Sequence, residues 1–220
     1  MKYTVPLIVT LNFINRRTCL QAGWPEGPHM CGSCDDYNLL FLIDAPHDYQ
    51  LAVPPVDWLQ SVVFLDQHSQ PRELPPGHFQ ITPPHTLSRH AFNAWAQFVV
   101  QALPAPLLRN FMIGTDLSDL VRLMRACSNR HLQLFCLEFS KDVQAPLEQL
   151  DGRHFLHLFA CLFGGPELNL HDYSDAGCAL EAICAVEGEM VMTCALHEAP
   201  QRRLLLLGEP VTPSTVEPRP

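Results

Sequence analysis

Short apolar runs in the first third of the chain are separated by proline, aspartate and histidine. Residues 3–14 are apolar and β-branched with a proline near their start, a pattern typical of an edge strand. Residues 38–43, 50–53 and 58–65 predict further strands of the same kind. The first 85 residues are therefore expected to form a strand-rich part built on an antiparallel sheet.

The period of the apolar positions changes at residue 87. From Leu87 to Ala102 apolar residues recur at helical spacing, with polar residues on the other face. Thr86 is a suitable N-cap for this helix, and Pro104 ends it. Residues 107–112 and 117–126 predict two shorter helices, so that residues 86–127 form a helical segment.

The remaining sequence predicts strands and helices in alternation. Residues 131–139 are typical of a buried strand, 153–163 fit either a strand or a helix, and 176–186 favour a helix. Residues 189–196 and 202–207 predict a hairpin, and the proline-rich residues 208–220 predict a disordered tail. The expected fold is a single α+β domain over residues 1–207, in which a few helices pack on an antiparallel sheet and residues 128–207 form a C-terminal α/β part.

The charge balance restricts the classes of partner. The chain has 14 Lys and Arg against 23 Asp and Glu, a net charge of -9, which argues against binding to nucleic acid or to an anionic membrane. We therefore expect proteins or small molecules as partners. Nine cysteines, an odd number without regular spacing, favour free thiols or a metal site in a reducing compartment.

One cysteine motif has the spacing of a metal site. His29, Cys31 and Cys34 form a His-x-Cys-x-x-Cys sequence, in which two thiolates can approach one tetrahedral zinc ion. The motif is incomplete, and a further ligand could come from Cys19 or His47. Thiols of a solvent-facing loop are the alternative interpretation.

Other candidate groups have simpler interpretations. Cys178, Cys184 and Cys194 are expected to act as small buried hydrophobic residues, and His154 and His157 as histidines bonded to the backbone. The sequence has no glycine-rich phosphate loop, nucleophile elbow or metalloprotease helix. The expectation from these observations is a protein without enzymatic activity.

Residues 86–114 are similar to a ubiquitin-ligase adaptor motif. An amphipathic helix is followed by a Leu-Pro-x-Pro turn and a second apolar segment, as in the SOCS box, and read from Leu103 the stretch also resembles an F-box. Packing of the helix into the protein's own core is the alternative. The residues that carry the predicted partner-binding site are Thr86, Leu87, Ala91, Trp95, Leu103, Pro104, Pro106, Leu107, Leu108 and Phe111.

The chain resembles the adenoviral early region four 34K family in three stretches that occur in the family's order. They are residues 93–100, residues 130–137, and Cys194 followed by residues 202–206. The resemblance implies a viral early protein in the host nucleus and cytoplasm. Together with a second viral early protein, it would recruit Elongin B/C and a Cullin to ubiquitinate host proteins. Two alternatives remain: an interaction module without ligase recruitment, and a small enzyme or dUTPase-like fold suggested by residues 74–79.

The cysteine motif gives a testable prediction. If His29, Cys31 and Cys34 hold zinc, the purified protein contains one equivalent of the metal, and chelation lowers its melting temperature, because zinc-binding energy of about 10 kcal/mol is folding energy in such sites. Metal analysis and thermal melts with and without chelator measure this. Zinc far below one equivalent, with an unchanged melting temperature, would remove the idea.

Overall fold

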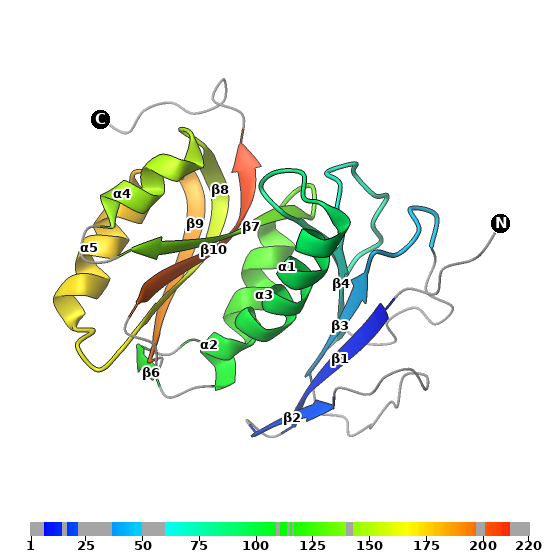
Figure 1. Ribbon diagram of the computed structural model, residues 1–220, viewed down its shortest axis with the longest axis horizontal. Coiled ribbons are helices and arrows are strands. Elements are labelled where there is room, and N and C mark those ends of the chain that lie inside the picture. Colours follow the sequence, from blue (N-terminus) through cyan, green and yellow to red (C-terminus); the bar gives the residue numbers. More distant parts are fainter. Residues whose placement is uncertain are drawn as a thin grey trace. The chain divides into compact units, whose positions relative to one another are not determined.

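The computed structural model describes residues 7–14, 17–21, 37–49, 60–108, 111–113, 115, 117–139, 143–196 and 201–211. The chain divides into two compact units, Met1–Val100 and Gln101–Pro220. Strands and helices are present in both units (Figure 1), which confirms the α+β fold class. Among the described helices, none is long and apolar enough to cross a membrane.

The sheet of the first unit is mixed rather than wholly antiparallel. Its strands follow the order β2-β1-β3-β4-β5. β1 pairs antiparallel with both β2 and β3, so the predicted edge strand lies inside the sheet. β3, β4 and β5 are parallel to one another. The bounds of these strands are β1 (Leu7–Ile14), β2 (Arg17–Gln21), β3 (Tyr37–Ile43), β4 (Gln60–Leu65) and β5 (His78–Thr82).

A buried arginine fastens the loops that follow the parallel strands. Parallel strands are usually joined by helices, but residues 66–77, between β4 and β5, form a loop. Arg72 lies in this loop and donates to both carboxylate oxygens of Asp66, at 2.5 and 2.8 Å. The same guanidinium donates to the carbonyl oxygens of Ala45 and Pro46 at 2.6 and 2.8 Å, and it lies 4.5 Å from the centre of the Phe64 ring. One side chain therefore ties the loop after β4 to the loop after β3.

Helix α1 (Arg89–Ala102) buries its apolar face. Phe92 and Val99 are 0% exposed and Ala96 is 1% exposed. Trp95 is half-buried and stacks on Phe92 with ring centres 5.7 Å apart. The helical spacing of apolar residues predicted this helix. In the structure its apolar stripe is buried in the protein's own core.

The second unit contains a sheet in the order β7-β10-β8-β9-β6. β10 pairs antiparallel with both β7 and β8, whereas β8 and β9 are parallel. The elements are α2 (Ala105–Leu108), β6 (Phe111–Ile113), α3 (Leu117–Ala126), β7 (His131–Phe139), α4 (Gln144–Leu147), the short 3₁₀ helix η1 (Glu148–Leu150), β8 (His154–Gly164), α5 (Leu170–Glu181), β9 (Cys184–Leu196) and β10 (Arg202–Val211).

Several sequence-based assignments differ from the structure in this unit. β9 and β10 are not paired as a hairpin, because β10 lies between β7 and β8. Residues 111–113 form β6 where a helix was expected. α5 begins at Leu170, six residues before the expected start, because the Asn169 side chain accepts from the backbone N–H of Asp172 in a capping box.

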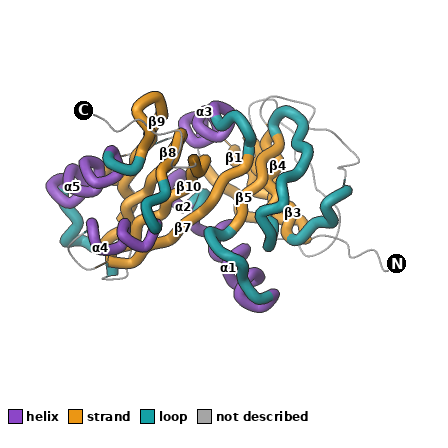
Figure 2. Tube along the Cα trace, turned by 90° about the horizontal axis from the view of Figure 1, so that it is seen from above, coloured by secondary structure: helices purple, strands orange, loops and turns teal. Residues whose placement is uncertain are grey.

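Helices cover both faces of the second sheet. Side chains of α5 and of the α4 region join β7, β8 and β10 in one apolar core, which includes Leu147, Leu180, Leu158 and Leu206. α3 packs against β8 and β9, and in Figure 2 the strands β8 and β9 separate it from α5. The second unit therefore has three layers, with the sheet in the middle.

β10 extends four residues into the segment that was expected to be disordered. A bulge at residues 208–210 interrupts its pairing with β8. Glu209, 4% exposed, accepts from the backbone N–H groups of Ser128 and Asn129 at 3.1 and 3.2 Å, and from the Ser128 hydroxyl at 2.8 Å. The carboxylate thus fixes the turn between α3 and β7 to the end of β10.

The Arg72 contacts give a prediction about stability. Arg72→Met leaves the buried Asp66 carboxylate without its cationic partner, so we expect a loss of about 3–5 kcal/mol in the free energy of unfolding. Arg203→Met is the control, because Arg203 pairs with Glu138 at the surface and such pairs contribute about 0–1 kcal/mol. Urea denaturation of both variants measures the difference, and equal losses would contradict the assigned role.

Candidate functional site

The outer side of β9 has backbone groups that the sheet does not use. β8 pairs with β9 along one side, from Cys184 to Leu196. On the other side β6 pairs only with Cys194 and Ala195. Within the described part of the chain, no strand pairs with the outer side of residues 189–192, which we call the open edge.

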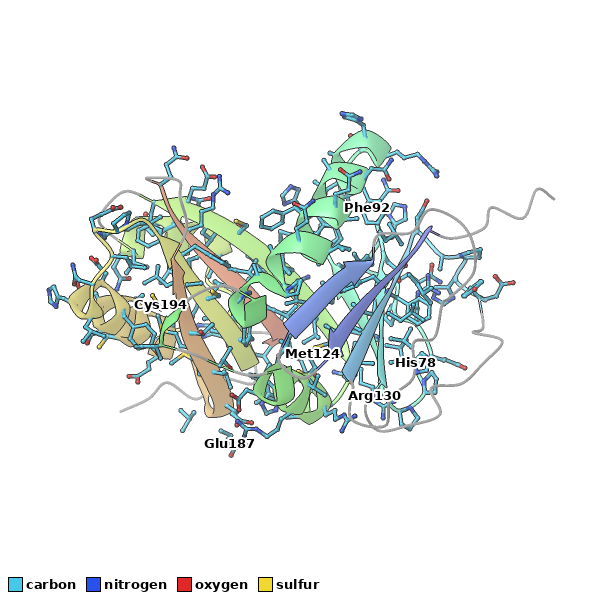
Figure 3. All side chains as sticks on the ribbon, turned by 90° about the horizontal axis from the view of Figure 1, so that it is seen from below. His78, Phe92, Met124, Arg130, Glu187 and Cys194 are labelled. Atoms are coloured by element: carbon cyan, nitrogen blue, oxygen red, sulfur yellow. The ribbon has the colours of Figure 1, made fainter. Side chains whose placement is uncertain are left out.

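A bulge precedes the open edge. Phe155 pairs with Cys184 and His157 with Glu189, so four residues of β9 lie opposite a single residue of β8. At Gly188 the backbones approach closely, because a Cβ placed there would lie 1.8 Å from the Leu156 carbonyl oxygen. Glu187 lies in this bulge, at the opposite end of β9 from Cys194 (Figure 3). The bulge and its glutamate shield one end of the strand.

The open edge has two chemically different faces. Met190 and Met192 point to the α5 side, where they pack at the border of the apolar core. Glu189 and Val191 point to the α3 side because side chains alternate along a strand. Glu189 forms an ion pair there with Arg122 of α3. All four residues of the open edge are half-buried.

The backbone amides of the two methionines point outward. The Glu189 amide points inward and donates to Nδ1 of His157 on β8 at 3.4 Å. Backbone groups alternate between the two sides of a strand, so the amides of Met190 and Met192 face away from β8. Further along this side of β9, β6 pairs with Cys194 and Ala195.

Tyr173 of α5 provides a hydrogen bond to one backbone carbonyl group of the open edge. Its hydroxyl donates to the Met192 carbonyl oxygen at 3.0 Å. Burial raises the pKa of Tyr173, and nearby Cys194 adds to the shift, so the phenol stays protonated as a donor. A carbonyl oxygen has two lone pairs, so Met192 can accept a second hydrogen bond.

Cys194, in the core beside the open edge, is uncharged at neutral pH. Burial raises the pKa of Cys194 to about 11, and the negative charge of Asp172 adds to this shift. Asp172 is itself held by Arg202 through two hydrogen bonds of 2.7 and 2.9 Å. At neutral pH Cys194 is therefore a thiol packed in the core, as expected for a small hydrophobic residue.

The predicted partner-binding residues do not form one exposed surface. Leu103 is 0% exposed, and Pro104 and Pro106 are buried. Thr86 is exposed, whereas the remaining residues of this set whose exposure is described, Leu87, Ala91 and Trp95, are half-buried. The side chains of Leu107, Leu108 and Phe111 are outside the description. The Leu-Pro-x-Pro turn is therefore packed inside the protein. The sequence could not show this, because core helices and docking helices have the same apolar periodicity.

The predicted zinc ligands His29, Cys31 and Cys34 lie outside the described residues. Within the described ranges, no group of three or more His, Cys, Asp or Glu residues could hold a metal ion. The zinc site stays a prediction.

Sequence reasoning missed the open edge. The sequence predicted a strand over residues 189–196, but only the order of strands in the sheet shows which strand lies outside. The expected hairpin would have covered one side of β9 with β10.

Comparison with known proteins gives structural matches only. No family model and no curated protein matches the sequence. Among solved structures, FtsZ from M. jannaschii has 13% identity and a TM-score of 0.48 over 72% of this chain and 49% of that chain. CetZ from Methanosaeta thermophila has 14% identity and a TM-score of 0.49 over 70% of this chain and 53% of that chain.

A GTPγS-form protofilament of TubZ from Bacillus thuringiensis serovar israelensis also matches, with 10% identity and a TM-score of 0.44 over 56% of this chain and 35% of that chain. The chain spans about half the length of the FtsZ and CetZ structures. At these identities and TM-scores the likeness carries no substrate, partner or assembly over to this chain.

The matches nevertheless correct the expected identity. They are FtsZ, CetZ and TubZ structures rather than adenoviral early proteins, so the resemblance to the early region four 34K family is contradicted. The ligase-adaptor function, with Elongin B/C, a Cullin, a second viral protein and host substrates, is contradicted with it. The expectation of a protein without enzymatic activity is contradicted by the same matches.

The hydrogen bond beside the open edge predicts a small, specific effect. Tyr173→Phe removes the donor to the Met192 carbonyl, and we expect a loss of about 0.5–1.5 kcal/mol in the free energy of unfolding. Tyr49→Phe is the control, since Tyr49 packs against an apolar cluster and its hydroxyl has no described partner. Thermal melts of both variants provide the comparison; a Tyr173 variant as stable as the wild type would show that this bond is dispensable.

Proposed function

We propose that the protein functions as a self-associating subunit and that the open edge of β9 is its contact surface. The observation that carries this proposal is the outer side of residues 189–192, with which no strand in the described part of the chain pairs. Because backbone groups alternate along a strand, the amides of Met190 and Met192 are expected to face that side. A strand edge of this kind is a template for another strand, because its N–H and C=O groups can continue the sheet.

The side chains of the open edge support association with an apolar surface. Met190, Val191 and Met192 are consecutive and half-buried, and the two methionines border the core under α5. An added strand would extend that core and remove these side chains from water, at about 25 cal/mol per Å² of apolar area. Interfaces between identical subunits are more apolar than other protein interfaces, which favours a second copy of this chain as the partner.

The protective features of β9 do not extend over residues 190–192 of the open edge. Proteins guard edge strands with bulges and charged residues. In β9 both devices are concentrated at residues 185–189, where the bulge, Glu187 and Glu189 lie. Residues 190–192 have neither, so the strand is guarded at its beginning and open at its centre.

Self-association is tested with a charged residue on the open edge. We expect the wild-type chain to associate increasingly with concentration in sedimentation equilibrium, and Val191→Lys to weaken association by about tenfold or more, because lysine on an edge opposes strand addition. Val186→Lys is the matched control: Val186 is 52% exposed, lies in the bulge and is more accessible, yet it is outside the open edge. This variant should associate like the wild type.

Two outcomes would contradict the proposal. A wild-type chain that stays monomeric over the whole concentration range would remove it. Equal weakening by Val191→Lys and Val186→Lys would place the contact elsewhere, or make it a general effect of charge. Circular dichroism of each variant establishes that the fold is intact before association is compared.

A further inference from the structure

Two methionines lie side by side at the border of the apolar core. Met190 and Met192 are two residues apart on β9, so their side chains point to the same face of the sheet, towards α5. Both are half-buried, and within the described part of the chain no strand pairs with the outer side of this stretch. Met124 of α3, labelled in Figure 3, is 0% exposed. A small molecule in solution therefore has access to the two methionines of β9 but not to Met124.

The Met192 side chain lies between two small residues. On β8, Ala160 is its cross-strand partner. On α5, Gly177 faces it, because a Cβ placed at Gly177 would lie 3.7 Å from the Met192 sulfur. Tyr173, one helical turn before Gly177, donates its hydroxyl hydrogen bond to the Met192 carbonyl oxygen at 3.0 Å. The Met192 thioether is therefore packed next to the backbone of α5.

An oxygen atom added to the Met192 sulfur would find the neighbouring hydrogen-bond donors in use. The backbone N–H groups in the middle of α5 donate within the helix. Tyr173 has a single O–H donor, and this donor is bonded to the Met192 carbonyl oxygen. A polar atom without a partner is unfavourable beside an apolar core. Conversion of the thioether to a sulfoxide would therefore weaken the packing of α5 on β9.

From these contacts we propose that Met190 and Met192 form a modification site whose oxidation by hydrogen peroxide loosens α5 from the sheet. In the reaction a sulfur lone pair attacks one oxygen of the peroxide and the O–O bond breaks. The proton on the transferred oxygen passes to the other oxygen, which leaves as water. Sulfur loses two electrons and the peroxide gains them. The product sulfoxide is polar, and methionine sulfoxide reductases return it to the thioether.

Peroxide treatment of the full chain tests the selectivity of the site. The protein is exposed to hydrogen peroxide for increasing times, and sulfoxides are located by mass spectrometry of its peptides. We expect Met190 and Met192 to be oxidised about tenfold or more faster than Met124, because oxidation of a thioether follows its exposure. In urea-denatured protein, the reference, the three methionines should react at similar rates. Similar rates in the folded chain would overturn the proposal.

Amide hydrogen exchange of α5 tests the structural consequence. We expect exchange over residues 170–181 to become about fivefold or more faster after oxidation, because a polar oxygen then lies beside the helix. Met190→Leu with Met192→Leu is the matched control, since leucine has a similar volume and no sulfur. This variant retains the native cysteines, including the exposed Cys178 of α5. Its α5 exchange should not respond to peroxide, and methionine sulfoxide reductase should restore slow exchange in the wild type.

Two further outcomes would overturn the proposal. One is selective oxidation of Met190 and Met192 without a change in α5 exchange. The other is equally faster exchange in the double leucine variant, which would assign the effect to a cysteine. If circular dichroism shows that this variant is not folded, Met192→Leu alone takes its place. All measurements use dilute, monomeric protein, so they hold whether or not the chain self-associates.

Discussion

The structure of the second unit depends on the requirement that backbone N–H and C=O groups inside a sheet be paired. β10 meets this requirement for two strands at once, because it lies between β7 and β8 although it is the last of the described strands. Leu204 to Leu207 are 0% exposed, so β10 is covered on both faces. With β10 at the centre, β9 lies towards the outside, and among the described strands only the short β6 lies beyond it. The open edge is thus a consequence of the strand order.

Buried charged side chains form hydrogen bonds with the backbone of the turns and loops next to the strands. Glu209 joins the end of β10 to the turn after α3. Arg72 has a comparable role in the first unit, where it joins the loop after β4 to the residues that follow β3. In both cases one buried charged side chain satisfies several otherwise unpaired groups, which is the condition under which such a charge is tolerated in a core. The rest of each sheet can then be apolar.

Much of the secondary structure could be predicted from the sequence, because it follows from local periodicity. The run of residues 131–139 predicted β7, and the helical spacing after Leu87 predicted α1. Pairing was harder to predict: β9 and β10 are neighbours in sequence but not in the sheet, and nothing in their residues records this. The amphipathic stripe of α1 likewise suggested a docking helix, although it is buried, since periodicity does not specify what covers an apolar face. The candidate site depends on strand order and was therefore beyond sequence reasoning.

The central claim is that the outward amides of β9 become paired when the protein associates. Amide hydrogen exchange, resolved by residue and followed as a function of protein concentration, tests it directly. The account predicts that the amides of Met190 and Met192 become protected as concentration rises. The amides of Glu189 and Val191, which already face β8, should change little. Exchange at Met190 and Met192 that is independent of concentration, in a sample shown to be associated, would contradict the account.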